Sequence, residues 1–228
     1  MKYFKLDGKP IESLSKYCDM TKENLSESDL SGADFSNRTF RDTDFSECNL
    51  EGASFDHATL IGCNFNLAYL INCNFHAVQA TSCNFTDVMA VDVDFEYGNF
   101  EDSDFYNADL ERAKFDDSNL KGCSFNKANL VNSKFQSTCL MDAYFYEAKF
   151  SNTDFSYSEF MNLTCFVKYQ INLKKIYNQL INEGCIINSV NYKNGTWRKR
   201  LGELGEVRYI DLFSYSAQEK SFFKFLGG

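Results

Sequence analysis

The sequence of 228 residues has few of the residues that build catalytic and metal centres. It contains two histidines, and its nine cysteines form no paired Cys-x-x-Cys motif, which argues against a cysteine-rich zinc site. No apolar run reaches the roughly 18 residues of a membrane helix, and the first residues, MKYFKLDGKPIE, contain no apolar stretch typical of a secretory signal. We therefore expect a soluble, cytoplasmic protein, not associated with a membrane, whose cysteines stay reduced.

Basic residues are also scarce. Lysine and arginine total 23 against 32 aspartate and glutamate residues, for a net charge of −9, so the chain as a whole is poorly suited to binding nucleic acid phosphates. The two histidines, His57 and His76, have no companion residue at the spacing of a catalytic triad or a zinc site. These absences predict a protein-binding protein that is not an enzyme and holds no cofactor and no metal.

A five-residue repeat is what the chain has in abundance. The multiples of five from residue 25 to residue 160 give 28 positions, of which 26 are Phe or Leu and two are Ala80 and Ala90. The position two residues earlier is small in most repeats, most often Ala, Cys or Ser. A helix needs a period of 3.6 and a strand a period of 2, so this chain must turn a corner once per repeat, with the large and small positions facing inward.

Units such as Ala33-Asp34-Phe35-Ser36-Asn37 and Ala128-Asn129-Leu130-Val131-Asn132 resemble those of the pentapeptide-repeat family. The resemblance covers about 140 of the 228 residues. It implies an all-β solenoid, namely a right-handed, four-sided (quadrilateral) β-helix with 20 residues per coil and therefore about seven coils. The two inward alanines remove bulk from this stack, and we expect local distortion near residues 78–92.

Three segments are predicted along the chain. Residues 1–20 form an N-terminal cap, in which Asp7-Gly8 favours a hairpin turn; residues 21–165 form the coils; and residues 166–228 form a small α+β unit with strands over 185–190 and 207–213. Apolar residues at helical spacing predict an amphipathic helix in this unit, which is a candidate capping or homodimer contact: Phe166, Tyr169, Leu173, Ile176, Tyr177 and Leu180.

Acidic residues dominate the repeat region. Residues 21–165 carry 24 acidic and 9 basic side chains, whereas residues 166–228 carry 5 acidic and 10 basic ones. The densest group, here called the acidic patch, consists of Asp92, Asp94, Glu96, Glu101, Asp102, Asp104, Asp109, Glu111, Asp116 and Asp117. It is either an ordinary solvated surface or a duplex mimic that occupies the basic groove of a DNA-binding protein. The resemblance to quinolone-resistance members of the family implies DNA gyrase or topoisomerase IV as that partner.

With 20 residues per coil, several outward apolar residues fall on one side of the rod. This candidate contact surface, the apolar face, consists of Tyr69, Ile71, Met89, Val91 and Val131. The competing function is therefore a structural or adaptor protein that presents this face, or the C-terminal unit, to a partner unrelated to DNA. Five cysteines occupy small inward positions as apolar fillers, namely Cys48, Cys63, Cys73, Cys83 and Cys123, and four lie outside those positions, namely Cys18, Cys139, Cys165 and Cys185.

Overall fold

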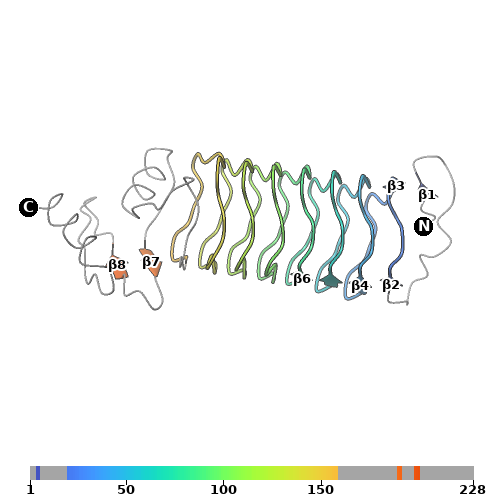
Figure 1. Ribbon diagram of the computed structural model, residues 1–228, viewed down its shortest axis with the longest axis horizontal. Helices are drawn as coiled ribbons and strands as arrows, with labels where there is room; N and C mark the ends of the chain where they lie inside the picture. The colour runs from blue at the N-terminus through green and yellow to red at the C-terminus, as the bar shows by residue number, and fades with distance from the viewer. Residues whose placement is uncertain (1–3, 6–19, 159–188, 192–197, 201–228) are drawn as a thin grey trace, which may run out of the picture.

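The computed structural model describes residues 4–5, 20–158, 189–191 and 198–200. Residues 20–158 wind into coils that stack along one axis to form a rod (Figure 1). Every bridged pair of residues within the rod is parallel and separated by 20 residues, from Asn24 with Asp44 to Lys134 with Asp154. The predicted coil of four pentapeptides is therefore confirmed, and these residues complete almost seven coils.

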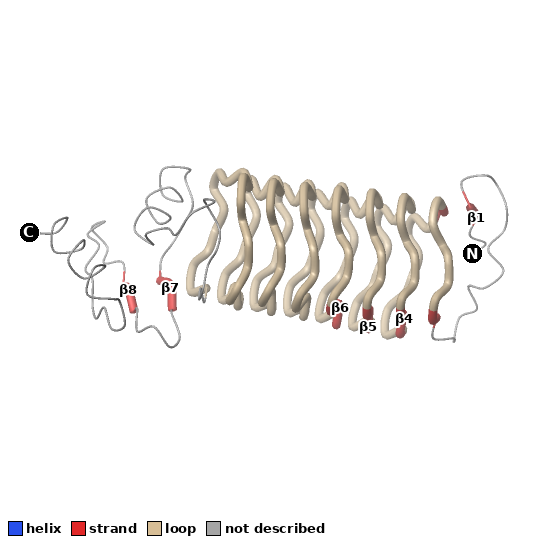
Figure 2. Tube along the Cα trace, in the orientation of Figure 1, coloured by secondary structure: helices blue, strands red, loops and turns tan. Residues whose placement is uncertain are grey.

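The strands are short. A four-stranded parallel sheet on one side of the rod consists of β2 (Met20–Thr21), β4 (Thr39–Arg41), β5 (Thr59–Ile61) and β6 (Gln79–Thr81). The other sides are held by single-residue bridges, so most of each coil is drawn as loop in Figure 2. Within the described residues there is no helix, and hence none long and apolar enough to cross a lipid bilayer.

The corners explain why the chain can turn every five residues. At all 28 positions that follow a central residue by two, from Lys22 to Tyr157, φ is positive. In many corners the next N–H donates to the central carbonyl, as from Ala33 to Leu30 at 3.0 Å, which is the geometry of a type II turn. Gly, Asn and Asp tolerate this conformation best, and they occupy 15 of the 28 positions.

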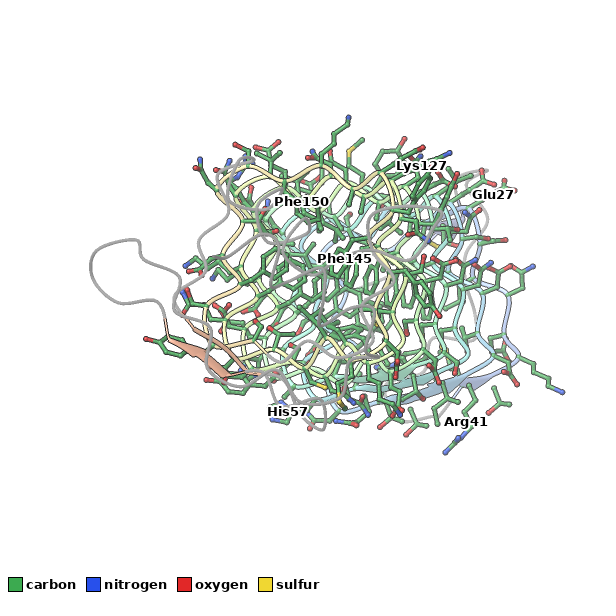
Figure 3. The ribbon with its side chains drawn as sticks, turned by 60° about the vertical axis from the view of Figure 1, so that its left-hand side comes forward. Glu27, Arg41, His57, Lys127, Phe145 and Phe150 are labelled. Atoms are coloured by element: carbon green, nitrogen blue, oxygen red, sulfur yellow. The ribbon has the colours of Figure 1, made fainter. Side chains whose placement is uncertain are left out.

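Aromatic ladders fill the interior. Phe45, Phe65, Phe85, Phe105, Phe125 and Phe145 stack face to face along one side, with ring centroids 4.8–5.0 Å apart. A second ladder runs from Phe35 to Phe155 on the opposite side, and its rings meet those of the first edge-on, as between Phe55 and Phe65. Figure 3 shows Phe145 and Phe150 within the coils, whereas Glu27, Arg41, His57 and Lys127 project outward. The inward assignment of the central residues is confirmed.

The small inward positions carry hydrogen-bond donors as well as fillers. Cys73 Sγ donates to the carbonyl of Leu50 at 2.8 Å, Cys123 Sγ to Phe100 at 2.9 Å, and Ser118 Oγ to Phe95 at 2.8 Å, each 23 residues earlier. All five cysteines predicted to be fillers are buried. Burial raises the pKa of Cys73 to about 12 and that of Cys123 further, so these thiols stay protonated at neutral pH.

The two inward alanines do not interrupt the backbone hydrogen bonds between adjacent coils. Ala80 N donates to Asn99 O at 2.7 Å and Ala90 N to Asp109 O at 2.8 Å, so the register expected to be distorted is intact. The backbone changes in the next coil on this side of the rod. The three-residue strand of the earlier coils ends with β6, and Ser103 N instead donates to Phe100 O across the corner. The Phe100 ring lies so close to Gly98 that a Cβ there would be 2.2 Å from its Cε2 atom, and only glycine fits.

The N-terminal end of the rod is covered in part. The strand β1 (Phe4–Lys5) pairs antiparallel with β3 (Ser28–Asp29) of the first coil. This contact blocks one side of an exposed coil edge, which is a place where other chains would otherwise pair. The rest of the predicted hairpin lies outside the described residues.

Two short strands are described in the C-terminal segment. The strand β7 (Ser189–Asn191) pairs antiparallel with β8 (Arg198–Arg200). The first predicted strand, 185–190, overlaps β7, whereas no strand was predicted at residues 198–200. The Asn194-Gly195 dipeptide, which lies between the two strands in the sequence, favours a hairpin turn and is the signal that was missed. The rest of the predicted unit lies outside the described residues: the strand over 207–213 and the helix with Phe166, Tyr169, Leu173, Ile176, Tyr177 and Leu180. Cys18, Cys165 and Cys185 also lie outside the described residues. The homodimer contact and the three-segment division remain predictions.

Candidate functional site

The acidic patch encircles the rod. Its ten residues span positions 92–117, which is more than one 20-residue coil, so they cannot share a single side. Asp92 and Glu111 lie at one corner, Glu101 and Asp102 at a second, and Glu96, Asp116 and Asp117 at a third; Asp94, Asp104 and Asp109 lie on sides between corners. The sequence placed these carboxylates in one group, and the coil spreads them over the circumference.

Three of these carboxylates have a structural role. Asp94, Asp104 and Asp109 each precede a central residue and accept a hydrogen bond from the backbone N–H two residues later, at 3.0, 2.9 and 3.3 Å. Asn64 and Asn84 form the same bond in earlier coils. An amide serves this turn as well as a carboxylate, so corner formation accounts for a polar residue here without requiring its charge.

Basic side chains of the following coil pair with two more carboxylates, and one of these side chains also contacts a third carboxylate beside it. Arg112 donates twice to Asp92, from Nε and Nη2 at 2.8 Å each, and also contacts Glu111. Lys121 Nζ lies 2.6 Å from Glu101 Oε1. The Arg112 guanidinium holds the pKa of Asp92 below its usual range. These exposed pairs fix the orientation of the carboxylates more than they stabilise the fold.

Glu96 and Asp116 are two carboxyl groups of the acidic patch whose pKa is raised. They occupy the same column one coil apart, because 20 residues separate them. Burial raises the pKa of both carboxyl groups, and the neighbouring carboxylates Asp94 for Glu96 and Asp154 for Asp116 raise it further. Lys114 and Lys134 offset part of these shifts, so the two carboxyl groups share their surroundings with positive charge.

Charge is distributed unevenly along the rod. Residues 20–117, here called the acidic coils, carry 20 acidic and 5 basic side chains. Residues 118–158, the neutral coils, carry 3 acidic and 4 basic ones. The whole net negative charge of the rod therefore lies in its first five coils.

Four residues of the predicted apolar face are brought together. Tyr69 and Met89 are bridged neighbours in adjacent coils and are 50% and 42% exposed; Ile71 and Val91 are stacked beside them. Val131 lies two coils beyond Val91, separated by the coil that carries Glu111. Leu67, 48% exposed, is a neighbour that the sequence analysis did not include. A surface hollow of about 320 Å³ adjoins this face and is lined by Glu47, Asn49, Glu51, Tyr69 and Ile71.

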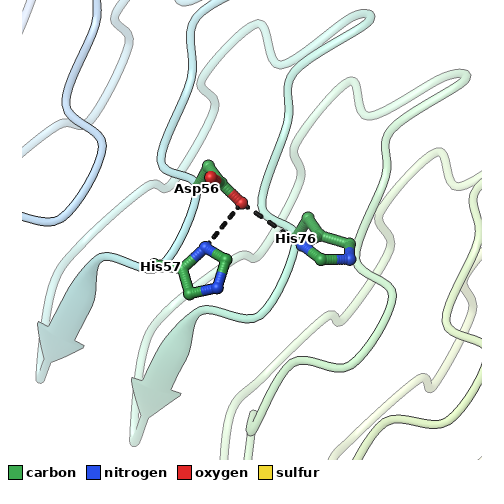
Figure 4. A group of neighbouring side chains, drawn as sticks. All are labelled: Asp56, His57 and His76. Carbon is green, nitrogen blue, oxygen red and sulfur yellow. Dashed lines mark hydrogen bonds and ion pairs between the residues drawn. The ribbon is translucent and has the colours of Figure 1, made fainter.

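The two histidines lie together and share a carboxylate. His57 Nδ1 and His76 Nδ1 lie 2.9 and 3.2 Å from the same oxygen, Oδ1 of Asp56, and the imidazole centroids are 5.8 Å apart (Figure 4). The two histidines are 19 positions apart in the sequence, and neither has a companion residue at the local spacing of a catalytic or zinc site. The 20-residue coil is the signal that would have paired them, since residues 57 and 76 then fall at the same corner of adjacent coils.

Comparison with known proteins identifies the class to which this fold belongs. A family model described as pentapeptide repeat region matches residues 52–125, and one described as pentapeptide repeats (8 copies) matches residues 16–47 and 108–145. The chain belongs to the pentapeptide repeat family.

Solved structures of one member of this family resemble the rod. Two trypsin-treated forms of QnrB1, a plasmid-mediated fluoroquinolone resistance protein, match it with a TM-score of 0.60 at 20% and 21% sequence identity. The matches cover 79% and 77% of this chain and 93% and 89% of the QnrB1 chains. At this identity the likeness establishes the fold alone. No curated protein matches the sequence significantly.

Proposed function

We propose that this protein is a non-enzymatic binding protein whose acidic coils occupy the DNA-binding surface of a type II topoisomerase, DNA gyrase or topoisomerase IV. Charge density is the observation that carries the proposal. Five coils at about 4.8 Å each are about 24 Å long, and duplex DNA of that length carries about 14 phosphate charges. The acidic coils carry a net charge of −15.

The arrangement of the charge supports the same function. Duplex DNA is charged around its circumference, and so are these coils, because the acidic patch occupies three of the four corners. A partner with a basic groove can therefore approach from more than one side. Electrostatic association of this kind is fast and weakens as salt is added.

The likeness to QnrB1 supports the choice of partner. That protein is described as a fluoroquinolone resistance protein, and the resemblance to quinolone-resistance members of the family implies a type II topoisomerase as the target. The likeness is one of fold, so the partner is proposed from this resemblance together with the charge of the coils.

The test is a titration of DNA gyrase supercoiling with this protein, with and without a fluoroquinolone, at two salt concentrations. We expect inhibition of supercoiling, or protection from the drug, that weakens at the higher salt concentration because the interaction is between exposed charges. No effect at micromolar protein would contradict the proposal.

Matched double variants sharpen this test. Asp102, Asp117, Asp142 and Glu147 all occupy corner positions with φ between 57° and 59°. Asp102→Asn with Asp117→Asn removes two charges from the acidic coils, and Asp142→Asn with Glu147→Gln removes two from the neutral coils. We expect the first pair to weaken the effect on gyrase several-fold and the second to leave it unchanged. Equal losses would mean that net charge, and not the acidic coils, is responsible.

A second candidate is an adaptor that binds a partner through the apolar face or presents the C-terminal unit. The contiguous exposure of Leu67, Tyr69 and Met89 favours the face. Replacing both Tyr69 and Met89 by Asn suits the fold, because Asn49 and Asn129 occupy this column in other coils. Binding that tolerates high salt and is lost in this variant would support the adaptor; binding that is lost in the Asp102→Asn and Asp117→Asn variant would contradict it.

A further inference from the structure

We propose that Asp56, His57 and His76 form a binding site for a divalent transition-metal ion, with zinc as the ion that the donor set fits best. None of the three residues belongs to the acidic patch or to the apolar face, although Glu96, Asp116 and Asp117 of the patch lie further along the same corner. The inference does not depend on the topoisomerase proposal.

The donor atoms already converge. Both imidazole Nδ1 atoms point at Asp56 Oδ1, at 2.9 and 3.2 Å, and one ligand atom from each residue lies within 4.8 Å of the others (Figure 4). Zinc bonds to nitrogen and oxygen of about 2.0–2.2 Å in a tetrahedron place the ligands roughly 3.4 Å apart. Small movements of the side chains would therefore suffice for an ion to replace the two hydrogen bonds.

The chemistry of the set is that of an open zinc site. Two neutral imidazoles and one carboxylate are ligands typical of zinc centres that leave a fourth position to water. The three side chains are accessible, with exposed fractions of 56% for His57, 37% for His76 and 34% for Asp56. An ion can enter from solvent without any rearrangement of the coils.

The backbone holds these ligands in place. His57 N donates to His76 O at 2.9 Å, so a rung of the coil ladder lies directly beneath the cluster. His76 N in turn donates to the side chain of Asn74 at 2.9 Å, and the Tyr97 ring packs against the His76 ring at 5.3 Å between centroids. Ligands mounted on a rigid, hydrogen-bonded scaffold need little reorganisation to bind an ion.

The surroundings favour a cation. Glu96 follows His76 in the same column one coil further on, and Asp116 follows Glu96. The carboxylates along this corner lower the electrostatic energy of a bound divalent ion. Because Asp56 and His57 lie in one coil and His76 in the next, the ion would also link adjacent coils and stabilise the rod by mass action.

Calorimetric titration of the untagged, full-length protein with zinc chloride tests the site. We expect one equivalent of zinc per chain, and affinity at least about tenfold lower in His57→Asn and in His76→Gln because each loses a direct ligand. These replacements suit the fold, since Asn37 and Gln136 occupy the same columns elsewhere. Asp142→Asn, which removes a carboxylate at a different corner in the neutral coils, should leave the affinity unchanged. Unchanged affinity in both histidine variants, or no binding up to millimolar zinc, would overturn the proposal.

Two further measurements separate this site from zinc bound by cysteine and from loss of the fold. With cobalt in place of zinc, we expect visible d–d bands without the near-ultraviolet charge-transfer band that thiolate ligands produce. The d–d bands should be lost in the histidine variants, and their persistence there would overturn the assignment. Without metal, the variants should unfold at the same temperature as the parent. Added zinc should raise that temperature in the parent and in Asp142→Asn, and an equal rise in the histidine variants would contradict the site.

Discussion

The acidic coils and the neutral coils share one backbone and differ almost entirely in their outward residues. The same phenylalanine ladders run through both regions, and the ladder hydrogen bonds continue between them, as from Phe115 N to Lys134 O at 2.8 Å. The outward positions change from 20 acidic and 5 basic residues to 3 acidic and 4 basic ones, and the neutral coils expose Tyr144, Tyr146 and Tyr157. The fold therefore constrains the inward residues and leaves the surface free to vary.

The comparison also separates structural from functional reasons for aspartate. Corner residues adopt positive φ, where Asn and Asp are both tolerated. The neutral coils use Asn132 and Asn152 together with Asp142, whereas the acidic coils use Asp42, Asp87, Asp92, Asp102 and Asp117 beside three asparagines. Since asparagine would satisfy the backbone equally well, turn geometry alone does not explain the excess of carboxylates. That excess supports a role for the charge.

The largest expected effect tests whether the two regions share one core. Phe95→Ala and Phe135→Ala each remove a fully buried ring that packs against four or more neighbouring rings. We expect each to lower the free energy of unfolding by about 3–5 kcal/mol, measured by urea denaturation. Phe→Leu at the same positions should cost much less, because Leu25 fills the same kind of position. A much smaller loss at Phe135 would show that the neutral coils unfold separately from the acidic ones.

A smaller effect is expected at the corners. Asn107 and Asn132 have φ of 54° and 60° in the acidic and neutral coils, and the side chain of each bonds to an adjacent coil. Replacement by Val should cost about 1–2 kcal/mol more than replacement by Gly, since a β-branched residue is strained at positive φ and both variants lose the side-chain bond. Thermal unfolding of the two Val–Gly pairs measures the difference. Unequal differences would mean that corner strain depends on the surrounding charge.

The smallest effect is a pH dependence confined to the acidic coils. Burial raises the pKa of Glu96 and Asp116, so the folded state binds these protons more readily than the unfolded state. This contribution to stability grows as the pH falls through the raised folded pKa values and is complete below the unfolded values of about 4. Glu96→Gln with Asp116→Asn should flatten the rise in unfolding temperature between neutral pH and about pH 4.

Asp92 provides a control of opposite sign. Arg112 lowers its pKa, so its contribution is present above the unfolded value and is lost as the pH falls through the lowered folded value. Asp92→Asn should therefore change the unfolding temperature below about pH 4 and leave intact its rise between neutral pH and about pH 4. Loss of that rise in Asp92→Asn would assign it to general charge repulsion and not to the partly buried carboxyl groups of Glu96 and Asp116.

Much of the fold was predictable because it depends on local chemistry. Phe65 and Phe85 face inward because nearly every five-residue repeat has one large apolar residue at its central position, which is buried in the interior of the coil. Cys63 and Cys83 fill the small inward position two residues earlier. Asp94 before its central residue forms the corner through a hydrogen bond only two residues long. Interactions that short are encoded in a single repeat, and twenty-eight repeats reinforce the signal.

What the sequence by itself determined is the period of five, the inward residues and the amount of charge on the outward ones. The tertiary structure decided which outward residues are neighbours: that His57 meets His76, that Tyr69 meets Met89, and that the acidic patch surrounds the rod. The physical reason is that lateral contacts join residues about 20 positions apart. This separation in sequence is set by the number of corners in one coil. That number is a property of the stacked backbone and cannot be deduced from a single repeat.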